Sequence, residues 1–246
     1  MEKFGIRVDL HMHSCLSPCG DMEMTPANLV GLAALGGLDA IALTDHNITF
    51  NVPAAVRAGK EYGITVVPGM ELETVEEVHV VCLFPDLEKL DEFQKIVIES
   101  YTQIPNKPEI FGEQVIMDEN DEILGYYPNM LLSPTGLSID EAIPMVLEMG
   151  GIAYPAHVDR DSFSVLSNLG AMPFDYPLEF AEISYECDLD ALYEKFPFMK
   201  KYTLIHASDA HYPQFIADPG ALLEVSENSP KGIIEALRSL PGGMIL

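Results

Sequence analysis

Two histidines, His11 and His13, stand two residues apart in a segment where apolar and polar residues alternate. The alternation over residues 6–13 predicts a β-strand, in which residues two apart point to the same face. His11, His13 and Asp9 would then share one face, while the apolar residues between them line the other. Two imidazoles at the end of a strand can bind one metal ion together. The alternative is a half-exposed edge strand with incidental histidines, so the rest of the chain has to decide between the two interpretations.

Strand-like and helix-like segments alternate along most of the 246 residues. We expect strands at residues 6–13, 39–44, 64–68, 78–84, 152–154, 180–184 and 202–206. We expect helices at about residues 25–36, 52–62, 87–101, 139–149, 189–196 and 230–240. This alternation predicts parallel strands joined by crossover helices, and six or seven such units predict an α/β barrel.

In a barrel of this type the functional site lies at the carboxyl ends of the strands. Most of the residues able to bind a metal fall at these ends, namely His11, His13, Asp45, His46, Glu71, His157, Asp209 and His211. His79 begins an apolar run of its own, and His206 falls within a predicted strand, where a core histidine is expected. Imidazole and carboxylate ligands suit zinc, iron or manganese, and a carboxylate such as Glu71 can bridge two ions.

Residues 87–138 interrupt the alternation. After the expected helix the sequence becomes proline-rich and acidic, and residues 114–117 and 123–127 flank an acidic turn as in a β-hairpin. The stretch is too long for an ordinary connection. We therefore expect a single domain over residues 1–246, with an inserted lid segment at about residues 87–138.

The composition restricts the partners and the location of the protein. A formal net charge of −26 repels a nucleic-acid backbone, so the charge predicts that the chain binds no long nucleic acid. The four cysteines lack zinc-finger spacing, no signal segment is visible, and residues 29–43 are too short to span a bilayer. These features predict a cytoplasmic protein with reduced thiols and no membrane partner.

Five short motifs, taken together, resemble one known family. In chain order they are DLHMH at 9–13, TDH at 44–46, GMELE at 69–73, PAH at 155–157 and SDAH at 208–211. This series resembles the PHP family, which takes its name from polymerases and histidinol phosphatase. The resemblance implies a distorted seven-stranded (β/α)7 TIM-like barrel with a bi- or trinuclear metal centre that hydrolyses phosphoesters.

The resemblance also implies two to three divalent transition-metal ions (zinc, manganese or iron), with Glu71 bridging two of them. The other ligands would be His11, His13 and Asp209 for the first ion, and His79 and His157 for the second.

A third ion would be bound by His46 and His211. The family's remaining ligand for this ion is a histidine or an aspartate, but this chain has Cys19 at that position. A thiolate is a competent ligand for zinc or iron, so we expect Cys19 to bind the third ion, with Asp21 as the alternative.

The function that follows is metal-dependent hydrolysis of a small phosphomonoester, of the nucleoside monophosphate or histidinol phosphate type, by a hydroxide shared between two ions. Arg160 is the expected phosphate clamp, with a surface salt bridge as its alternative role. His211 or Asp45 would protonate the leaving oxygen, although Asp45 equally fits a residue that orients a ligating histidine. Glu73 is expected to be solvated or structural, and the role of Glu182 stays open.

Three other functions remain possible from the sequence. An amidohydrolase also opens with two histidines on a strand, but that family often bridges its metals with a carbamylated lysine, and the lysines here lie in polar or helical settings. The others are an exonuclease-type phosphodiesterase and a non-catalytic metal-binding regulatory module.

Overall fold

The computed structural model describes residues 3–172, 180–216, 220–240 and 244–245. Its strands are β1 (Phe4–Met12), β2 (Ala40–Leu43), β3 (Thr65–Glu73), β4 (His79–Leu83), β5 (Val115–Met117), β6 (Ile123–Tyr126), β7 (Ile152–Pro155), β8 (Phe180–Ser184), β9 (Thr203–Ala207), β10 (Ala221–Val225) and β11 (Met244–Ile245). Its α-helices are α1 (Pro26–Leu35), α2 (Val52–Tyr62), α3 (Leu87–Ser100), α4 (Pro108–Phe111), α5 (Ile139–Glu148), α6 (Val165–Asn168), α7 (Leu189–Lys195) and α8 (Pro230–Arg238). Two 3-10 helices are η1 (Pro197–Lys201) and η2 (Pro213–Phe215).

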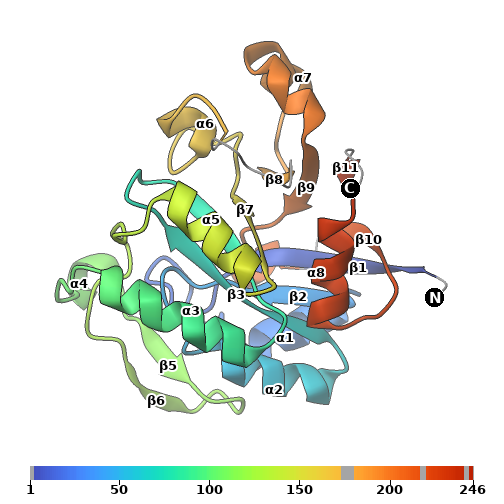
Figure 1. The fold of residues 1–246 in the computed structure, drawn as a ribbon. Coiled ribbons are helices and arrows are strands. Elements are labelled where there is room, and N and C mark those ends of the chain that lie inside the picture. Colours follow the sequence, from blue (N-terminus) through green and yellow to red (C-terminus); the bar gives the residue numbers. More distant parts are fainter. Residues whose placement is uncertain (1–2, 173–179, 217–219, 241–243, 246) are drawn as a thin grey trace.

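The strands form an α/β fold with two main sheets and one hairpin (Figure 1). The larger sheet has the order β10-β1-β2-β3-β4-β7, and the smaller has the order β11-β9-β8. Strands β1, β2 and β3 are parallel, as are β8 and β9. Strand β4 runs antiparallel to both β3 and β7, and β10 runs antiparallel to β1. The expected α/β class is therefore confirmed, but the expected parallel direction is wrong for β4, and the antiparallel strand β10 was not predicted.

The predicted seven-stranded barrel is not confirmed, because in the described residues no strand ladder joins β7 to β8 or β9 to β1, where an isolated parallel bridge pairs Met12 with Ala210. Single backbone hydrogen bonds join the two sheets at these places. The N–H of Val158 donates to the carbonyl of Glu182 at 2.9 Å, and the N–H of His13 donates to the carbonyl of Ala210 at 3.0 Å. Both bonds lie just beyond the strands that carry the site, so the sheets are held together where the functional residues gather.

A shared apolar core lies beneath that edge. One buried cluster takes residues from strands of both sheets, including Leu10 of β1, Val67 of β3, Tyr154 of β7 and Phe180 of β8. A second cluster packs α1, α2, α3 and α5 against the outside of the larger sheet. Burial of these side chains stabilises each by about 1.5–3 kcal/mol relative to exposure, which fixes the strand ends against one another.

The predicted hairpin within the insertion is present as β5 and β6, beside α3 in Figure 1. The lid is not confirmed, because buried hydrogen bonds tie the insertion to the loops that follow β1 and β2. Asn51 Nδ2 donates to the carbonyl of Val115 at 3.0 Å, and Asn47 Nδ2 donates to the carbonyl of Leu131 at 2.9 Å. Gln94 Oε1 accepts from the N–H of Thr49 at 2.7 Å. The insertion is thus a packed support for these loops.

Helix ends follow the sequence closely. Helix α1 begins at Pro26, and α2 ends at Gly63, whose φ of 74° is one that glycine adopts without strain. Thr25 precedes α1 without capping it, and Asp121 of the insertion accepts instead from the N–H of Ala27 at 2.9 Å. Within the described ranges, every helix is too short or too polar to cross a bilayer.

Candidate metal centre

The strands deliver the predicted polar residues to one edge of the sheets. His11 lies in β1 and His13 just after it, His46 follows β2, His157 follows β7, and Asp209 and His211 follow β9. Glu71 lies within β3, not after it, because β3 continues to Glu73 by pairing with the antiparallel β4. That reversal also explains His79, since the first residue of β4 lies beside the carboxyl ends of its parallel neighbours.

Glu71 occupies the middle of the group and is 1% exposed. Five ring nitrogens lie within 3.3 Å of its two carboxylate oxygens. Oε1 faces the rings of His79, His157 and His11. Oε2 faces the rings of His46 and His13. Burial alone would raise the pKa of Glu71, but the imidazoles of His79, His11 and His46 hold it well below its usual range. Glu71 is therefore an anionic centre surrounded by imidazoles.

Asp209 provides a second carboxylate, which lies beside the imidazoles of His11 and His13. Its Oδ1 lies 3.0 Å from His13 Nε2 and 3.3 Å from His11 Nε2, and its Oδ2 pairs with the Arg160 guanidinium. Burial would raise the pKa of Asp209, but His11 and His13 hold it well below its usual range. Asp209 and His157 have φ angles of 49° and 28°, in a region that costs non-glycine residues energy and that often marks functional sites.

Three histidines are held with Nδ1 directed away from the centre. Both oxygens of Glu182 lie 3.0 Å from His11 Nδ1, and Ser17 Oγ lies 3.0 Å from His13 Nδ1. The carbonyl of Asp209 lies 2.8 Å from His211 Nδ1. Because these partners accept at Nδ1, we assign the proton to Nδ1, which leaves Nε2 of each ring free to bind a cation.

A buried hydrogen-bond chain extends from His13 to the insertion. Ser17 Oγ donates to Asp45 Oδ1 at 2.7 Å, and Ser14 Oγ donates to Asp45 Oδ2 at 2.6 Å. Asn51 Nδ2 donates to Ser14 Oγ at 3.0 Å, and Asn51 Oδ1 accepts from the N–H of Met117 at 2.9 Å. The insertion thereby supports the orientation of His13.

These residues fit a group of bound cations. His11 Nε2 and His13 Nε2 face each other at 3.0 Å, and His46 Nδ1, Glu71 Oε2 and Asp209 Oδ1 are buried without a well-aligned hydrogen bond, although an opposing group of the site lies within 3.3 Å of each. Buried polar atoms without partners are costly, and a cation would satisfy all of them. Three sets in the described ranges lie close enough to share an ion: His11, His13, Glu71 and Asp209; His46, Glu71 and His79; and His13, His46 and His211.

The protonation of these histidines depends on burial and on the neighbouring carboxylates. Burial would lower the pKa of His13, but hydrogen bonds to Asp209 and Glu71 raise it to about 9. Burial lowers the pKa of His46 to about 3 and that of His211 to about 4, with Glu71 and Asp209 opposing it. Protons and metal ions therefore compete for these nitrogens, as expected of a metal site.

The group opens into a hollow of about 320 Å³. Its lining includes Arg160, whose side chain is 42% exposed, and Phe163, whose ring stacks on His79 with centroids 4.7 Å apart. Glu73, expected to be solvated or structural, also lines this hollow and is 5% exposed, and burial raises its pKa to about 7.

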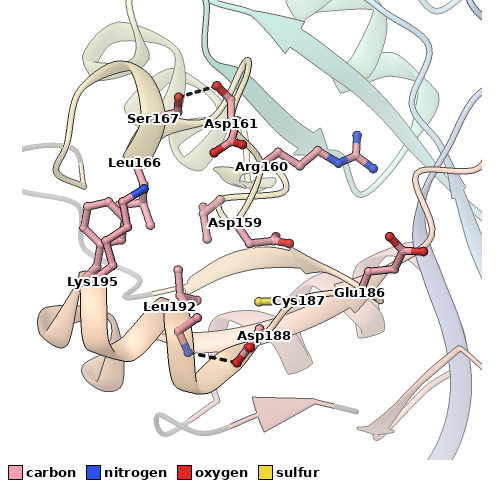
Figure 2. A pocket seen from close by; sticks show the side chains of 13 residues that line it. Asp159, Arg160, Asp161, Leu166, Ser167, Glu186, Cys187, Asp188, Leu192 and Lys195 are labelled. Carbon is pink, nitrogen blue, oxygen red and sulfur yellow. Dashed lines mark hydrogen bonds between the residues drawn. The ribbon is translucent and has the colours of Figure 1, made fainter.

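Two further cavities adjoin Arg160. A groove of about 1260 Å³ runs past the ends of β8 and β9 and includes Tyr212 and Phe215. A smaller cavity of about 240 Å³ lies next to α7. Figure 2 shows Arg160 extending from this smaller cavity, away from Asp159 and Asp161. Its guanidinium instead meets Asp209, so Arg160 stands between the cavities and the metal-binding group.

Three of the predicted ligands, His157, Cys19 and Asp21, belong to none of the three ligand sets, although His157 Nε2 lies 3.2 Å from Glu71 Oε1. Cys19 lines the hollow beside His46 and His211 but belongs to none of these sets. Burial, with Glu71 and Asp209, raises the pKa of its thiol. The carboxylate of Asp21 accepts from the N–H of Glu23 at 2.8 Å.

Three supporting residues were not assigned a role from the sequence. The role of Glu182 was left open, and Ser17 and Phe163 were not singled out. The place of Glu182 at a predicted strand end was a usable signal, whereas Phe163 lies in an irregular loop. Asp45 was predicted as a proton donor or an orienting residue, and its oxygens are taken by Ser14 and Ser17. His206 is partly exposed, and its ring stacks on Tyr185.

Comparisons with known proteins agree with this geometry. Residues 9–137 match the family model described as the PHP domain. Over 71 residues, 29% of this chain, the sequence is 41% identical to the PolC-type DNA polymerase III of Oceanobacillus iheyensis, of which it covers 5%. The chain thus spans a small part of the curated polymerases that it matches.

Solved structures share the fold at low sequence identity. The lesion-specific endonuclease Q of Pyrococcus furiosus superposes with a TM-score of 0.67 at 20% identity, over 98% of this chain and 58% of that one. A two-domain protein of Bacteroides vulgatus that contains a predicted PHP-like metal-dependent phosphoesterase gives a TM-score of 0.56 at 20% identity, over 97% and 64% of the chains.

The prediction that the chain binds no long nucleic acid is contradicted by these comparisons. A structure of endonuclease Q holds a 27-mer duplex with an abasic lesion at the active site, and its fold matches this chain with a TM-score of 0.66 at 19% identity, over 98% of this chain and 58% of that one. The error lies in the use of net charge. A sum over the whole chain does not describe the field at one groove, where bound divalent cations reverse the local sign.

Proposed function

The chain belongs to the PHP domain family, and on this premise we propose that it is a metal-dependent phosphoesterase that hydrolyses a small phosphomonoester. The observation that carries the proposal is the arrangement around Glu71. Buried imidazoles and a second carboxylate converge on it, and several of their ring nitrogens and oxygens lack a well-aligned hydrogen bond. A structural role alone does not require so many unsatisfied polar atoms in one place.

The proposal includes two to three divalent transition-metal ions. His11, His13, Glu71 and Asp209 would hold the first. Glu71 would bridge to a second ion held with His79 and His46, and His157, whose Nε2 lies 3.2 Å from Glu71 Oε1, is the further proposed ligand of this ion. His46 and His211 would hold a third, with Cys19 as the proposed additional ligand from the wall of the hollow. When bound, such ions neutralise phosphate oxygens and make water acidic enough to attack phosphorus at neutral pH.

Arg160 binds the phosphate in this proposal. Its guanidinium pairs with Asp209, a predicted metal ligand, and its side chain is exposed enough to reach a ligand in the hollow. A guanidinium can pair with two phosphate oxygens at once, which fixes the orientation of the ester.

With two ions bound, His211 is the better candidate to protonate the leaving oxygen through Nε2, because in a three-ion site that nitrogen would be a metal ligand. Its side chain is 19% exposed and lines the hollow, whereas Asp45 is fully buried and holds three hydrogen bonds from Ser14 and Ser17. Asp45 therefore acts by orienting Ser17, and through it His13.

A second candidate function is hydrolysis of a nucleic-acid phosphodiester. The observation that favours it is the groove of about 1260 Å³, which opens from the metal-binding group past the exposed rings of Tyr212 and Phe215. Aromatic rings in an open groove can stack on bases. The fold shared with endonuclease Q is consistent with this candidate.

Hydrolysis by metal-loaded protein separates the candidates. The panel contains nucleoside monophosphates, histidinol phosphate, an oligonucleotide, a duplex with an abasic site and a cyclic amide. We expect phosphate release from the monoesters. Cleavage of the nucleic acids alone would favour the nuclease, cleavage of the amide alone would favour an amidohydrolase, and inactivity throughout with metal bound would indicate a regulatory module.

A further inference from the structure

Glu73 brings a second negative charge into the hollow beside Glu71. The two residues are two apart in β3, so their side chains point to the same face, with Cα atoms about 7 Å apart. Glu71 contacts the imidazoles of the metal-binding group, whereas Glu73 lines the hollow further along the strand. Glu73 is absent from all three sets that could share an ion in the described part of the chain.

The backbone of Glu73 is fixed on both sides. Its N–H donates to Asn47 Oδ1 at 2.9 Å, and its carbonyl accepts from the N–H of Thr135 at 2.9 Å and from Thr135 Oγ1 at 2.8 Å. Asn47 and Thr135 are themselves buried. The direction of the Glu73 side chain is therefore set by the fold, as a residue that selects a ligand requires.

The carboxylate of Glu73 has no hydrogen bond or ion pair to any residue within the described ranges, although the residue is 5% exposed. Its oxygens are not among the fully enclosed polar atoms without a partner, so they face the open space of the hollow, where a ligand can donate to them. The neighbouring walls of the hollow are Leu132 and the ring of Phe163, which offer apolar contact.

We propose that Glu73 is the specificity-determining residue for the leaving group, and that it selects phosphate esters whose alcohol carries a nitrogen donor, such as an ammonium or amino group. The inference rests on the proposed function, because the phosphate must be held at the metal-binding group. A donor three or four bonds from phosphorus fits the spacing of Glu71 and Glu73. The apolar walls accept the carbon chain between them.

Binding to metal-loaded protein tests this without any turnover. The probes are aminopropylphosphonate and butylphosphonate, which match in length and differ in the terminal ammonium. We expect the ammonium to be preferred by about tenfold to a hundredfold in Kd, as for a hydrogen bond between charged groups. Glu73→Gln should abolish most of that preference while the metal content stays unchanged. Glu77→Gln is the matched control, because it removes an exposed charge near Glu73 but outside the hollow.

Four results would overturn the inference. Equal binding of the two phosphonates by the wild-type protein, or no binding of either, would show that Glu73 does not select an amine. An undiminished preference in Glu73→Gln would place the selection elsewhere, and loss of an ion from that variant would make Glu73 a metal ligand. Phosphomonoester hydrolysis is measured separately, so the proposed function can fail or stand independently of this result.

Discussion

Replacing Ser17 with alanine should weaken metal binding although Ser17 belongs to none of the ligand sets. The Ser17 hydroxyl donates to Asp45 Oδ1 at 2.7 Å and lies 3.0 Å from His13 Nδ1. In Ser17→Ala the His13 Nδ1–H loses its acceptor inside a fully buried environment, while Asp45 Oδ1 keeps the N–H of Ser14 at 2.7 Å. We therefore expect the variant to disturb the orientation of His13 more than the structure of the loop that contains residue 17.

Two magnitudes follow from this geometry. Loss of a residue that orients a ligating histidine typically costs about 10- to 100-fold in metal affinity. An unsatisfied buried donor costs about 1–3 kcal/mol, so the metal-free variant should unfold at a lower temperature than the wild-type protein.

Competition with a chelator measures the affinity of each protein for manganese or zinc, and thermal denaturation without metal measures stability. Ser167→Ala is the control, because it removes an exposed hydroxyl that donates to the carbonyl of Asp161 at 2.6 Å, away from the ligands. If Ser17→Ala folds and binds metal as tightly as the wild-type protein, the inferred tautomer and orientation of His13 are wrong.

Three further predictions concern charge in the same site. Glu71→Gln should lose at least one ion and about a hundredfold or more in activity at saturating metal; near wild-type activity would refute the bridging role. Arg160→Ala should raise the KM for a phosphomonoester by about tenfold or more with little change in kcat; unchanged kinetics would return Arg160 to a surface role. The histidines of the metal-free site should contribute most to stability near pH 6.5, as followed by thermal denaturation across pH. Above pH 6.5 stability should fall by about 3 kcal/mol as the proton held by His13, with its pKa of about 9, is lost. Below pH 6.5 stability should also fall, because His46 and His211 have pKa values of about 3 and 4 in the folded protein. In the unfolded chain these histidines are protonated at a higher pH, so acid favours unfolding. A flat profile would contradict these pKa shifts.

The sequence predicted the helices and most strands because their signals are local. Pro26, Gly63 and the alternating apolar residues determine where elements begin and end, and the structure places those elements within a few residues of the prediction. The direction of β4 was not predictable in this way, because a strand's alternation is the same whichever way it runs. That direction explains why His79 reaches the site from the beginning of its strand.

The site was partly predictable for a related reason. Imidazole and carboxylate side chains can bind metal ions by themselves. The types and positions of His11, His13, Glu71 and Asp209 therefore indicated a shared function. Ser17, Glu182 and Glu73 depend on long-range contacts for their roles, and such residue types are common in every loop and strand. The hydrogen bond between Glu182 and His11 joins positions 171 residues apart, which no local pattern reveals.

The lid was predicted because the insertion is too long for an ordinary connection, and it is not confirmed. The fixed points are single polar side chains, Asn47, Asn51 and Gln94, whose buried hydrogen bonds hold the insertion in place. In the sequence these residues cannot be distinguished from other polar residues. Their role in holding the insertion is visible only in the folded structure.

The metal content of the native protein tests the central claim most directly. Protein purified without chelator is analysed for manganese, iron and zinc, and then again after metal removal and reloading with each metal. We expect at least two ions per chain, because His11, His13, Glu71 and Asp209 form one ligand set and His46, Glu71 and His79 form another. Fewer than one ion per chain, with no uptake on reloading, would contradict the account.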